Sequence, residues 1–357
     1  MNKKLLSHKS IAVVALLLCV LALSASCTTP VEESVEEAST APAVSETDTG
    51  EAEAEPTAES ADSLPPYLDP TLDTEARIDD LLSRMTLDEK IGQMTLVEKG
   101  SIPPRDVTRY HIGGVLSGGG GGPDGDNSPA GWHEMVGEYQ AATLETELQI
   151  PLIYGVDSVH GHSNVTGATI FPHNIGLGAT RNPDLVAEIA HATALETLAT
   201  GIHWNYAPVA AVPRDIRWGR TYEGFGETSD LVTQMAAAQL RGFQMVDGVT
   251  DLAHPNTLLG TPKHFVGDGG TAWGSSTTGD YLIDQGDTQV DEAILRDVHL
   301  SPYPVLIENG ALSIMASFSS WNGLKMHAHE YLLNDVLKGE LGFTGFVVSD
   351  WEAIDQI

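Results

Sequence analysis

Short apolar runs alternate with longer amphipathic segments from about residue 64 to the end of the chain. Short apolar runs bounded by turn residues are typical of buried strands, and apolar residues that recur every three or four positions are typical of helices. The pattern predicts helices over 74–84, from 86 onward, and over 130–148, 183–200, 230–243, 291–309 and 329–341. It predicts strands over 112–116, 151–157, 203–209, 261–266, 312–318 and 345–348. Alternation of this kind indicates a parallel α/β architecture.

Residues at the predicted helix ends support these assignments. Thr86 and Asn182 have side chains suited to an N-cap, Pro183 suits a first helical turn, and Gly201 follows the end of its helix. Pro302 is expected to interrupt the predicted helix that contains it.

Polar clusters follow several different predicted strands, at Asp157, Arg220, Lys263–His264 and Asp350. A closed (β/α)₈ barrel builds its site from many strand ends, whereas an open doubly wound sheet concentrates its site at one switch point. The run Gly118–Gly122 lacks the spacing of a dinucleotide-binding loop and predicts a loop at the rim. The distribution therefore favours a (β/α)₈ TIM-type barrel over residues 64–357, with the open sheet as the alternative.

The first 27 residues have the organisation of a secretory signal. A basic start precedes an apolar run, Ile11–Leu23, and small residues then precede Cys27. The run is too short to favour a transmembrane helix. A cysteine after small residues resembles the lipobox of bacterial lipoproteins, although Ser24 stands where that motif usually has leucine. We expect Cys27 to be lipidated, with ordinary cleavage of the signal segment as the alternative. In either case we expect an exported protein of a bacterium, either periplasmic or an outer-membrane or cell-surface lipoprotein.

Residues 28–63 contain eleven acidic residues, no basic residue and almost no large apolar side chain. Such a segment buries too little surface to offset its ordering entropy, so it predicts a disordered acidic linker. The whole chain has a formal net charge of −32. This charge argues against nucleic acid and against anionic membranes as partners, and leaves a lipid anchor as the expected membrane contact. A neutral sugar is not repelled.

The stretch Gly345–Trp351 contains the most informative candidate site. A short apolar run, typical of a buried strand, is followed directly by the Asp350 carboxylate and the Trp351 indole. A carboxylate at a strand end beside a flat apolar ring suits a nucleophile that cleaves sugars. The alternative is an acidic residue that caps the next helix.

Two further clusters are ambiguous when each is taken alone. The stretch Gly155–His162 offers Asp157 and two histidines, but no partner cluster completes a metal shell, so no metal is predicted. Asp157 could instead accept hydrogen bonds from sugar hydroxyls. Three arginines lie within Arg214–Arg220, and some are expected to pair with neighbouring acids such as Glu223.

Together the clusters resemble glycoside hydrolase family 3, the β-glucosidase and exo-β-glucanase type. The matching stretches follow one another in the family's order over essentially Asp73 to the end. They are YGVDSVHGHSNVTGATIFPHNIGLGATRNPDL, PRDIRWGRTYEGFGE, PKHFVGDGG, SFSSWNGLKMH and GFVVSDWEAID. The resemblance implies a (β/α)₈ barrel, here incomplete at its C-terminal end, and implies no cofactor.

The resemblance also implies roles for individual residues. Asp350 corresponds to the catalytic nucleophile, and Trp351 to a sugar platform beside the scissile bond. The residues that correspond to ligands of the terminal glucosyl hydroxyls are Asp157, Arg220, Lys263 and His264, with Glu223 orienting Arg220 or the sugar. One departure is Phe318, where some members have a tyrosine whose hydroxyl touches the nucleophile.

The implied reaction is retaining hydrolysis, which needs a second carboxyl about 5–5.5 Å from the nucleophile. In the glucosidase branch this acid comes from a second domain after the barrel, so we expect a chain that stops at Ile357 to be an N-terminal fragment with little activity of its own. The N-acetylhexosaminidase branch is an alternative, but it has a histidine where this chain has Asp268 and an Asp-Ser-His motif that is not found here. A second alternative is a lipoprotein that binds a glucosyl unit without cleaving it.

Overall fold

The computed structural model describes residues 64–357, and these residues form one unit. The predicted signal segment with Cys27 and the predicted linker 28–63 lie outside the described residues. None of the helices described is long and apolar enough to cross a membrane.

A parallel sheet forms the first half of the fold, in the order β1–β2–β3–β4–β7. Its second strand pairs in register on both sides, so that Val115 of β2 lies opposite Val97 of β1 and Tyr154 of β3. The strands are β1 (Leu96–Glu98), β2 (Gly114–Ser117), β3 (Ile153–Val156), β4 (Trp204–Asn205) and β7 (Leu259–Gly260). Parallel neighbours need a crossover connection, and most of the helices lie in these connections.

The parallel order continues beyond β7 through single bridges. Val209 pairs with Lys263, and Phe265 pairs with Ala316, next to the strand β9 (Ser313–Met315). β9 in turn pairs in parallel with β12 (Phe346–Val348). Within residues 64–357, no ladder joins β12 back to β1. The described chain therefore has a TIM-like parallel α/β arrangement with an open side between its first and last strands.

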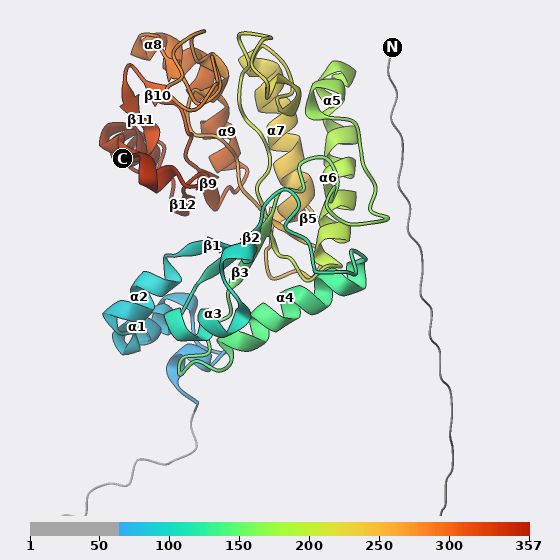
Figure 1. The fold of residues 1–357 in the computed structure, drawn as a ribbon, viewed down its shortest axis with the longest axis vertical. Helices are drawn as coiled ribbons and strands as arrows, with labels where there is room; N and C mark the ends of the chain where they lie inside the picture. Colours follow the sequence, from blue (N-terminus) through green and yellow to red (C-terminus); the bar gives the residue numbers. More distant parts are fainter. Residues whose placement is uncertain (1–63) are drawn as a thin grey trace, which may run out of the picture. The chain divides into compact units, whose positions relative to one another are not determined.

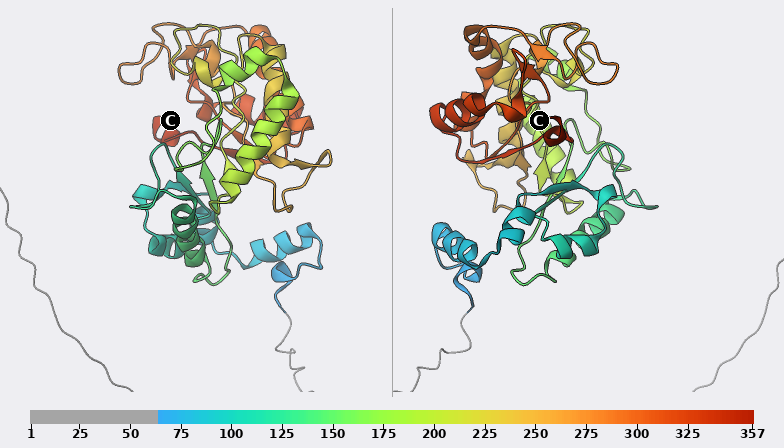
Figure 2. Two further views of the ribbon diagram at one scale, coloured as in Figure 1. Left: turned by 90° about the vertical axis from the view of Figure 1, so that its right-hand side faces the viewer. Right: turned by 60° about the vertical axis from the view of Figure 1, so that its left-hand side comes forward.

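Helices pack on the outside of these strands. Figure 1 shows α6, α7 and α9 side by side in the upper part, with α4 beneath the first strands. The two views in Figure 2 show the same separation, with residues up to about 150 below and the later residues above. The helices are α1 (Thr74–Arg84), α2 (Leu87–Gln93), α3 (Pro104–Tyr110), α4 (Pro129–Thr143), α5 (Asn174–Thr180), α6 (Pro183–Leu198), α7 (Ser229–Gln244), α8 (Glu292–Ile294) and α9 (Pro302–Glu308), with π-helical stretches at Leu295–Leu300 and Tyr331–Glu340.

The predicted helix starts are confirmed at their caps. Thr86 and Glu89 form a reciprocal capping box, and the Asn182 side chain accepts a hydrogen bond from the Leu185 amide. The predicted interruption at Pro302 is confirmed, because the π-helical stretch ends at Leu300 and Pro302 occupies the first turn of a new helix, α9.

The strands are shorter than predicted, and several elements were not predicted. β1 has only three residues, all half-buried, and α5 contains two glycines that weaken any helical prediction. α3 was also missed. The same is true of the short ladders formed by β5 (Met245–Val246) with β6 (Val249–Thr250), and by β8 (Asp287–Thr288) with β10 (Ser320–Trp321) and β11 (Leu324–Lys325).

Two apolar clusters support the strands from outside. The larger one packs α5, α6, α7, α9 and both π-helical stretches together, around Phe225, Met235 and Leu240. The smaller one packs α3 and α4 against β2 and β3, around Trp132. Buried clusters on the helix side hold the strand ends in place, so the loops at those ends can carry polar side chains.

Candidate active site

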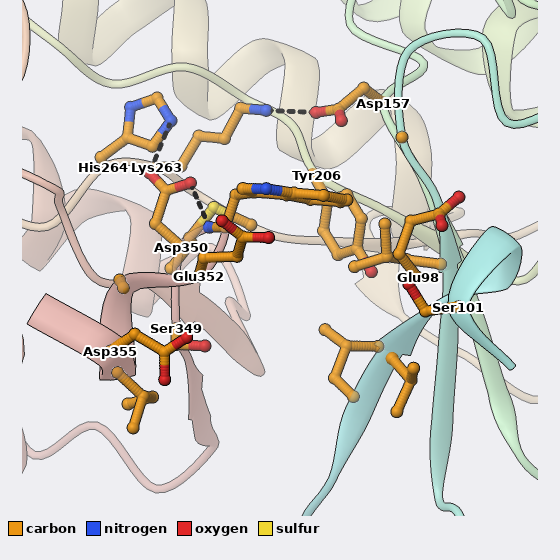
Figure 3. Close-up of a pocket in the computed structure, with 18 of the residues that line it drawn as sticks. Glu98, Ser101, Asp157, Tyr206, Lys263, His264, Ser349, Asp350, Glu352 and Asp355 are labelled. Carbon is orange, nitrogen blue, oxygen red and sulfur yellow. Dashed lines mark hydrogen bonds and ion pairs between the residues drawn. The ribbon is translucent and has the colours of Figure 1, made fainter. Parts of the chain in front are cut away.

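A pocket of about 390 Å³ opens where the strands end at their carboxyl side. Figure 3 shows its two walls: Glu98 and Ser101 come from the β1 side, and Asp350, Glu352 and Asp355 come from the chain after β12. Its lining also includes the other predicted ligands, namely Asp157, Arg220, Lys263, His264 and Trp351. The structure thus brings together six of the seven predicted site residues, and the seventh, Glu223, contacts Arg220.

Asp350 lies just after β12, separated from it by Ser349. Its backbone amide and one of its carboxylate oxygens are both held by hydrogen bonds. Its amide N–H donates to His327 Nε2 at 3.0 Å, and its Oδ1 accepts from the Trp351 amide at 2.7 Å. Oδ2 is buried and accepts no hydrogen bond from the described residues. The nearest basic side-chain atom to Oδ2 is His264 Nε2, 3.8 Å away, which is too long for a hydrogen bond. One carboxylate oxygen is therefore held, and the other is buried without a hydrogen bond from the described residues.

The strand before Asp350 is only partly buried. Phe346 is 39% exposed, whereas Val348 is buried, so the prediction of a buried strand is wrong at its first residue. The reason is that β12 pairs with β9 alone among the described residues. The Phe346 ring packs edge-on against Trp204, with centroids 5.5 Å apart.

Asp157 and Lys263 form an ion pair at the far wall of the pocket. Lys263 Nζ donates to Asp157 Oδ1 at 2.5 Å, and the Lys263 side chain is 5% exposed. A buried ammonium needs such a partner, because an unpaired charge in this position would be costly. The Asp157 side chain is 43% exposed, so its second oxygen remains available to a ligand.

Arg220 and Glu223 form a bidentate pair. Arg220 Nε and Nη2 each donate to a Glu223 oxygen at 2.9 Å, and Nη2 also lies 3.0 Å from His264 Nε2. Burial raises the pKa of the Glu223 carboxyl, but hydrogen bonds and charge from Arg220, with smaller contributions from Lys263 and His264, outweigh it and lower that pKa to about 2. Glu223 is therefore ionised and anchors the guanidinium. Of the two roles predicted for Glu223, this geometry matches orientation of Arg220.

His264 is held from its other side by Asp268. Its Nδ1 lies 2.7 Å from Asp268 Oδ2, and both side chains are buried. The sequence places the two residues four positions apart, but the contact depends on the turn at Gly267, which has a positive φ of 102°. Asp268 was noted only as a difference between branches, so its contact with His264 was missed.

The aromatic residues near Asp350 differ in their positions. Trp351 lines the pocket and is 47% exposed, as a platform for a flat sugar face requires. Tyr206 also lines the pocket, and its buried hydroxyl has no hydrogen-bond partner among the described residues. Gly155 makes room for it, because a Cβ there would lie 2.1 Å from the Tyr206 hydroxyl oxygen. Phe318 lies beside His327, with ring centroids 6.4 Å apart.

Several pocket residues were not predicted. His327 falls within the stretch SFSSWNGLKMH, which signalled the site without pointing to this residue. Glu98, Glu352 and Asp355 add three carboxyls to the lining. Glu352 and Asp355 fall within the stretch GFVVSDWEAID, which signalled the site without pointing to them, and no sequence pattern distinguishes Glu98 from a surface acid.

The two histidines of the Gly155–His162 stretch have separate surroundings. His160 Nδ1 lies 2.7 Å from the Phe171 carbonyl oxygen, whereas His162 is buried against Trp132. Across residues 64–357, no group of three or more His, Cys, Asp or Glu side chains is arranged to hold a metal ion.

A parallel α/β fold with carboxylates and an indole at its strand ends is an arrangement that can bind and cleave sugars. The family model described as the glycosyl hydrolase family 3 N terminal domain matches residues 86–357. The chain belongs to this family.

Relatives with known names match most of this chain. A lysosomal beta glucosidase of Dictyostelium discoideum is 35% identical over 300 residues, which are 78% of this chain and 35% of that protein. A periplasmic beta-glucosidase of Salmonella typhimurium is 30% identical over 284 residues, 79% of this chain and 34% of that protein. The chain thus spans about a third of the length of these two relatives.

Solved structures show the same fold. The exo-1,3/1,4-beta-glucanase of a Pseudoalteromonas species is 46% identical, with a TM-score of 0.72 over 78% of this chain and 34% of that one. The beta-glucosidase of Listeria innocua, solved in complex with isofagomine, is 28% identical, with a TM-score of 0.67 over 80% of this chain and 37% of that one.

Proposed function

We propose that this chain carries the nucleophile half of a retaining, exo-acting β-glucosidase that releases terminal β-D-glucose from oligosaccharides or β-glucans. The observation that carries the proposal is the Asp350 carboxylate. It follows a strand, lines the pocket with one oxygen that accepts no hydrogen bond from the described residues, and faces polar residues suited to sugar hydroxyls. The relatives named as beta-glucosidases and as an exo-beta-glucanase support this substrate class.

In this scheme each residue has a separate task. Asp350 Oδ2 attacks the anomeric carbon and forms a glycosyl–enzyme ester while the aglycone leaves, and water then releases glucose with the β configuration retained. Asp157, Lys263, Arg220 and His264 hold the glucosyl hydroxyls. Glu223 fixes Arg220, and the exposed face of Trp351 supports the sugar ring.

The acid that protonates the leaving oxygen is proposed to lie outside residues 64–357. Among the described carboxyls of the pocket, Asp157 is occupied by its ion pair with Lys263, and the proposal gives no acid role to the remaining three, Glu98, Glu352 and Asp355. A general acid contributes about 10²–10⁴-fold to such a reaction.

Export is also part of the proposal. The signal segment 1–27, lipidation at Cys27, the linker 28–63 and the barrel domain 64–357 together describe a lipoprotein with its enzyme domain outside the cytoplasm. The periplasmic location named for the Salmonella typhimurium relative supports this proposed location.

The test of the nucleophile uses Asp350→Ala in a longer form of the protein that cleaves aryl β-glucosides. We expect turnover to fall by at least about 10⁴-fold while glucose still binds, because the covalent step is lost. Added azide should restore cleavage and yield the α-glucosyl azide, since the small anion takes the place of the carboxylate. A variant that keeps near wild-type turnover would contradict the assignment.

The same assay separates the substrate classes. Aryl β-glucoside, β-xyloside and N-acetyl-β-glucosaminide are compared on the unmodified protein. Preference for the glucoside supports the proposal. Preference for the N-acetyl sugar would favour the hexosaminidase branch, and tight glucose binding without cleavage of any of the three would favour a binding protein.

A further inference from the structure

The contacts of His264 determine which of its ring nitrogens carries the proton. Arg220 Nη2 lies 3.0 Å from His264 Nε2, and a guanidinium nitrogen is always a donor. Nε2 must therefore accept in this contact. A proton on Nε2 would place two donors against each other.

The opposite nitrogen has a matching acceptor. Asp268 Oδ2 lies 2.7 Å from His264 Nδ1, so Nδ1 donates and the carboxylate accepts. The Asp268 side chain is buried, and His264 is its side-chain hydrogen-bond partner among residues 64–357. Its other oxygen, Oδ1, is buried with no hydrogen-bond partner in the same part of the chain. Burying a carboxylate with a single hydrogen-bond partner costs free energy of folding. This cost indicates that the role of Asp268 is its contact with His264.

The position of the His264 ring proton affects the carboxylate of Asp350. Its free Oδ2 lies 3.8 Å from His264 Nε2. If Nε2 carried the proton, a small ring movement would let it donate to Oδ2 and tie up the lone pair that attacks the sugar. With the proton on Nδ1, the single lone pair of Nε2 accepts from Arg220, and no N–H is presented to Oδ2.

We propose that Asp268 is a positioning residue: it holds His264 in the Nδ1–H form, so that Nε2 accepts from Arg220 and leaves Asp350 Oδ2 without a hydrogen bond. The tautomer itself follows from contacts within this chain. Its effect on turnover rests on the proposed function of the site.

The structural part is tested by nuclear magnetic resonance on the 357-residue chain, with ¹⁵N in the histidine rings. His264→Gln identifies the His264 signals, and the two-bond couplings to the ring protons distinguish Nδ1 from Nε2. We expect a protonated Nδ1 and an unprotonated Nε2 in the wild type. Asp268→Asn keeps this pattern because the amide oxygen still accepts, whereas Asp268→Leu removes the acceptor and moves proton occupancy to Nε2.

A protonated Nε2 in the wild type, or unchanged His264 signals in Asp268→Leu, would overturn the proposal. Circular dichroism and thermal unfolding establish that both variants are folded, and Asp268→Asn is the matched control for loss of the charge alone. This measurement needs no activity, so it remains decisive if the chain is not part of a glucosidase.

The kinetic part uses a form of the protein that cleaves aryl β-glucosides. Asp268→Leu is expected to lower kcat/KM by about 10- to 100-fold, the range for loss of one charge-assisted hydrogen bond. Asp268→Asn is expected to stay within about threefold of the wild type, because it keeps the tautomer. Equal losses in the two variants would show that Asp268 acts through its charge, and would overturn the proposed role of the tautomer.

Discussion

At the scale of residues, the site is a set of charges that balance in pairs. Lys263 is paired with Asp157, and Arg220 is paired with Glu223. Each cation is thereby fixed in position before a ligand arrives, which reduces the ordering cost of binding a neutral sugar. Asp350 differs from these paired acids because one of its oxygens is buried and has no hydrogen-bond partner among the described residues.

The pair Arg220–Glu223 predicts a specific pH dependence of stability. The pKa of Glu223 is lowered from 4.5 to about 2 in the folded chain, so the folded state binds fewer protons than the unfolded state between these values. Its contribution, on the order of 3 kcal/mol, is present above about pH 4.5 and is lost as the pH falls towards 2. We expect Glu223→Gln to lower the free energy of unfolding at pH 7, and its difference from wild type to shrink in acid.

Urea unfolding of the 357-residue chain between pH 7 and pH 3 measures this difference. Glu292→Gln is the matched control, because Glu292 pairs with Arg296 through a side chain that is 43% exposed. An exposed pair contributes about 0–1 kcal/mol, so this control should change little. A larger loss in Glu292→Gln than in Glu223→Gln would contradict the prediction.

At the scale of elements, α6 packs closely on α7, and α7 in turn contacts β7, the strand that precedes Lys263. The two helices approach where Gly242 of α7 faces α6, and a Cβ there would lie 2.3 Å from the Ala187 carbonyl oxygen. Only glycine fits at this separation without moving the backbone of a neighbour. The helical pattern predicted both helices, but it did not show which residue sets their distance.

Gly242→Ala is therefore expected to destabilise the chain by about 1–3 kcal/mol, the usual cost of overpacking. Gly137→Ala in α4 is the matched control, because Gly137 is exposed and its added Cβ would meet nothing within 4 Å. Alanine has the higher helix propensity, so this control should stabilise the chain by about 0.5–1 kcal/mol. Thermal unfolding of both variants measures whether their changes in stability have opposite signs. Equal changes in the two variants would refute the packing argument.

At the scale of the whole molecule, the site lies between the two ends of the strand order. Glu98 and Ser101 belong to the β1 side, and Asp350 and Glu352 belong to the β12 side (Figure 3). The pocket wall is therefore formed by segments that are far apart in sequence, and it opens where β1 and β12 do not pair within residues 64–357. This open side is where a further acid-bearing segment would have access to the sugar.

The proposed absence of the acid from residues 64–357 predicts how the 357-residue chain reacts with activated substrates. A dinitrophenyl β-glucoside needs no protonation of its leaving group, so Asp350 should release about one dinitrophenolate per chain in a burst. Slow turnover follows, because no base assists the water that cleaves the ester. Stopped-flow absorbance measures the burst, with Asp350→Asn as the control that should show none.

Steady turnover of an unactivated alkyl β-glucoside by the same chain would contradict this prediction. It would place the acid among Glu98, Glu352 and Asp355. Glu98→Gln, Glu352→Gln and Asp355→Asn would then identify it through selective loss of activity on the unactivated substrate.

The sequence by itself predicted the alternation of the main strands and helices and most of the residues that the structure gathers around the pocket. Apolar periodicity depends on local backbone geometry, so the helices at Thr74–Arg84 and Pro183–Leu198 were predicted closely. Asp350 was predicted because a carboxylate directly after an apolar strand is a local pattern within a characteristic stretch.

Only the tertiary structure decided which side chains meet. His327 binds the Asp350 amide from 23 residues away, Tyr206 enters the pocket through the space left by Gly155, and Asp268 turns back onto His264. Contacts of this kind depend on distances between segments rather than on the character of either residue. The Asp350 carboxylate combines both cases: Oδ1 is held by the amide of the next residue, Trp351, whereas the surroundings of Oδ2 depend on segments that are distant in sequence.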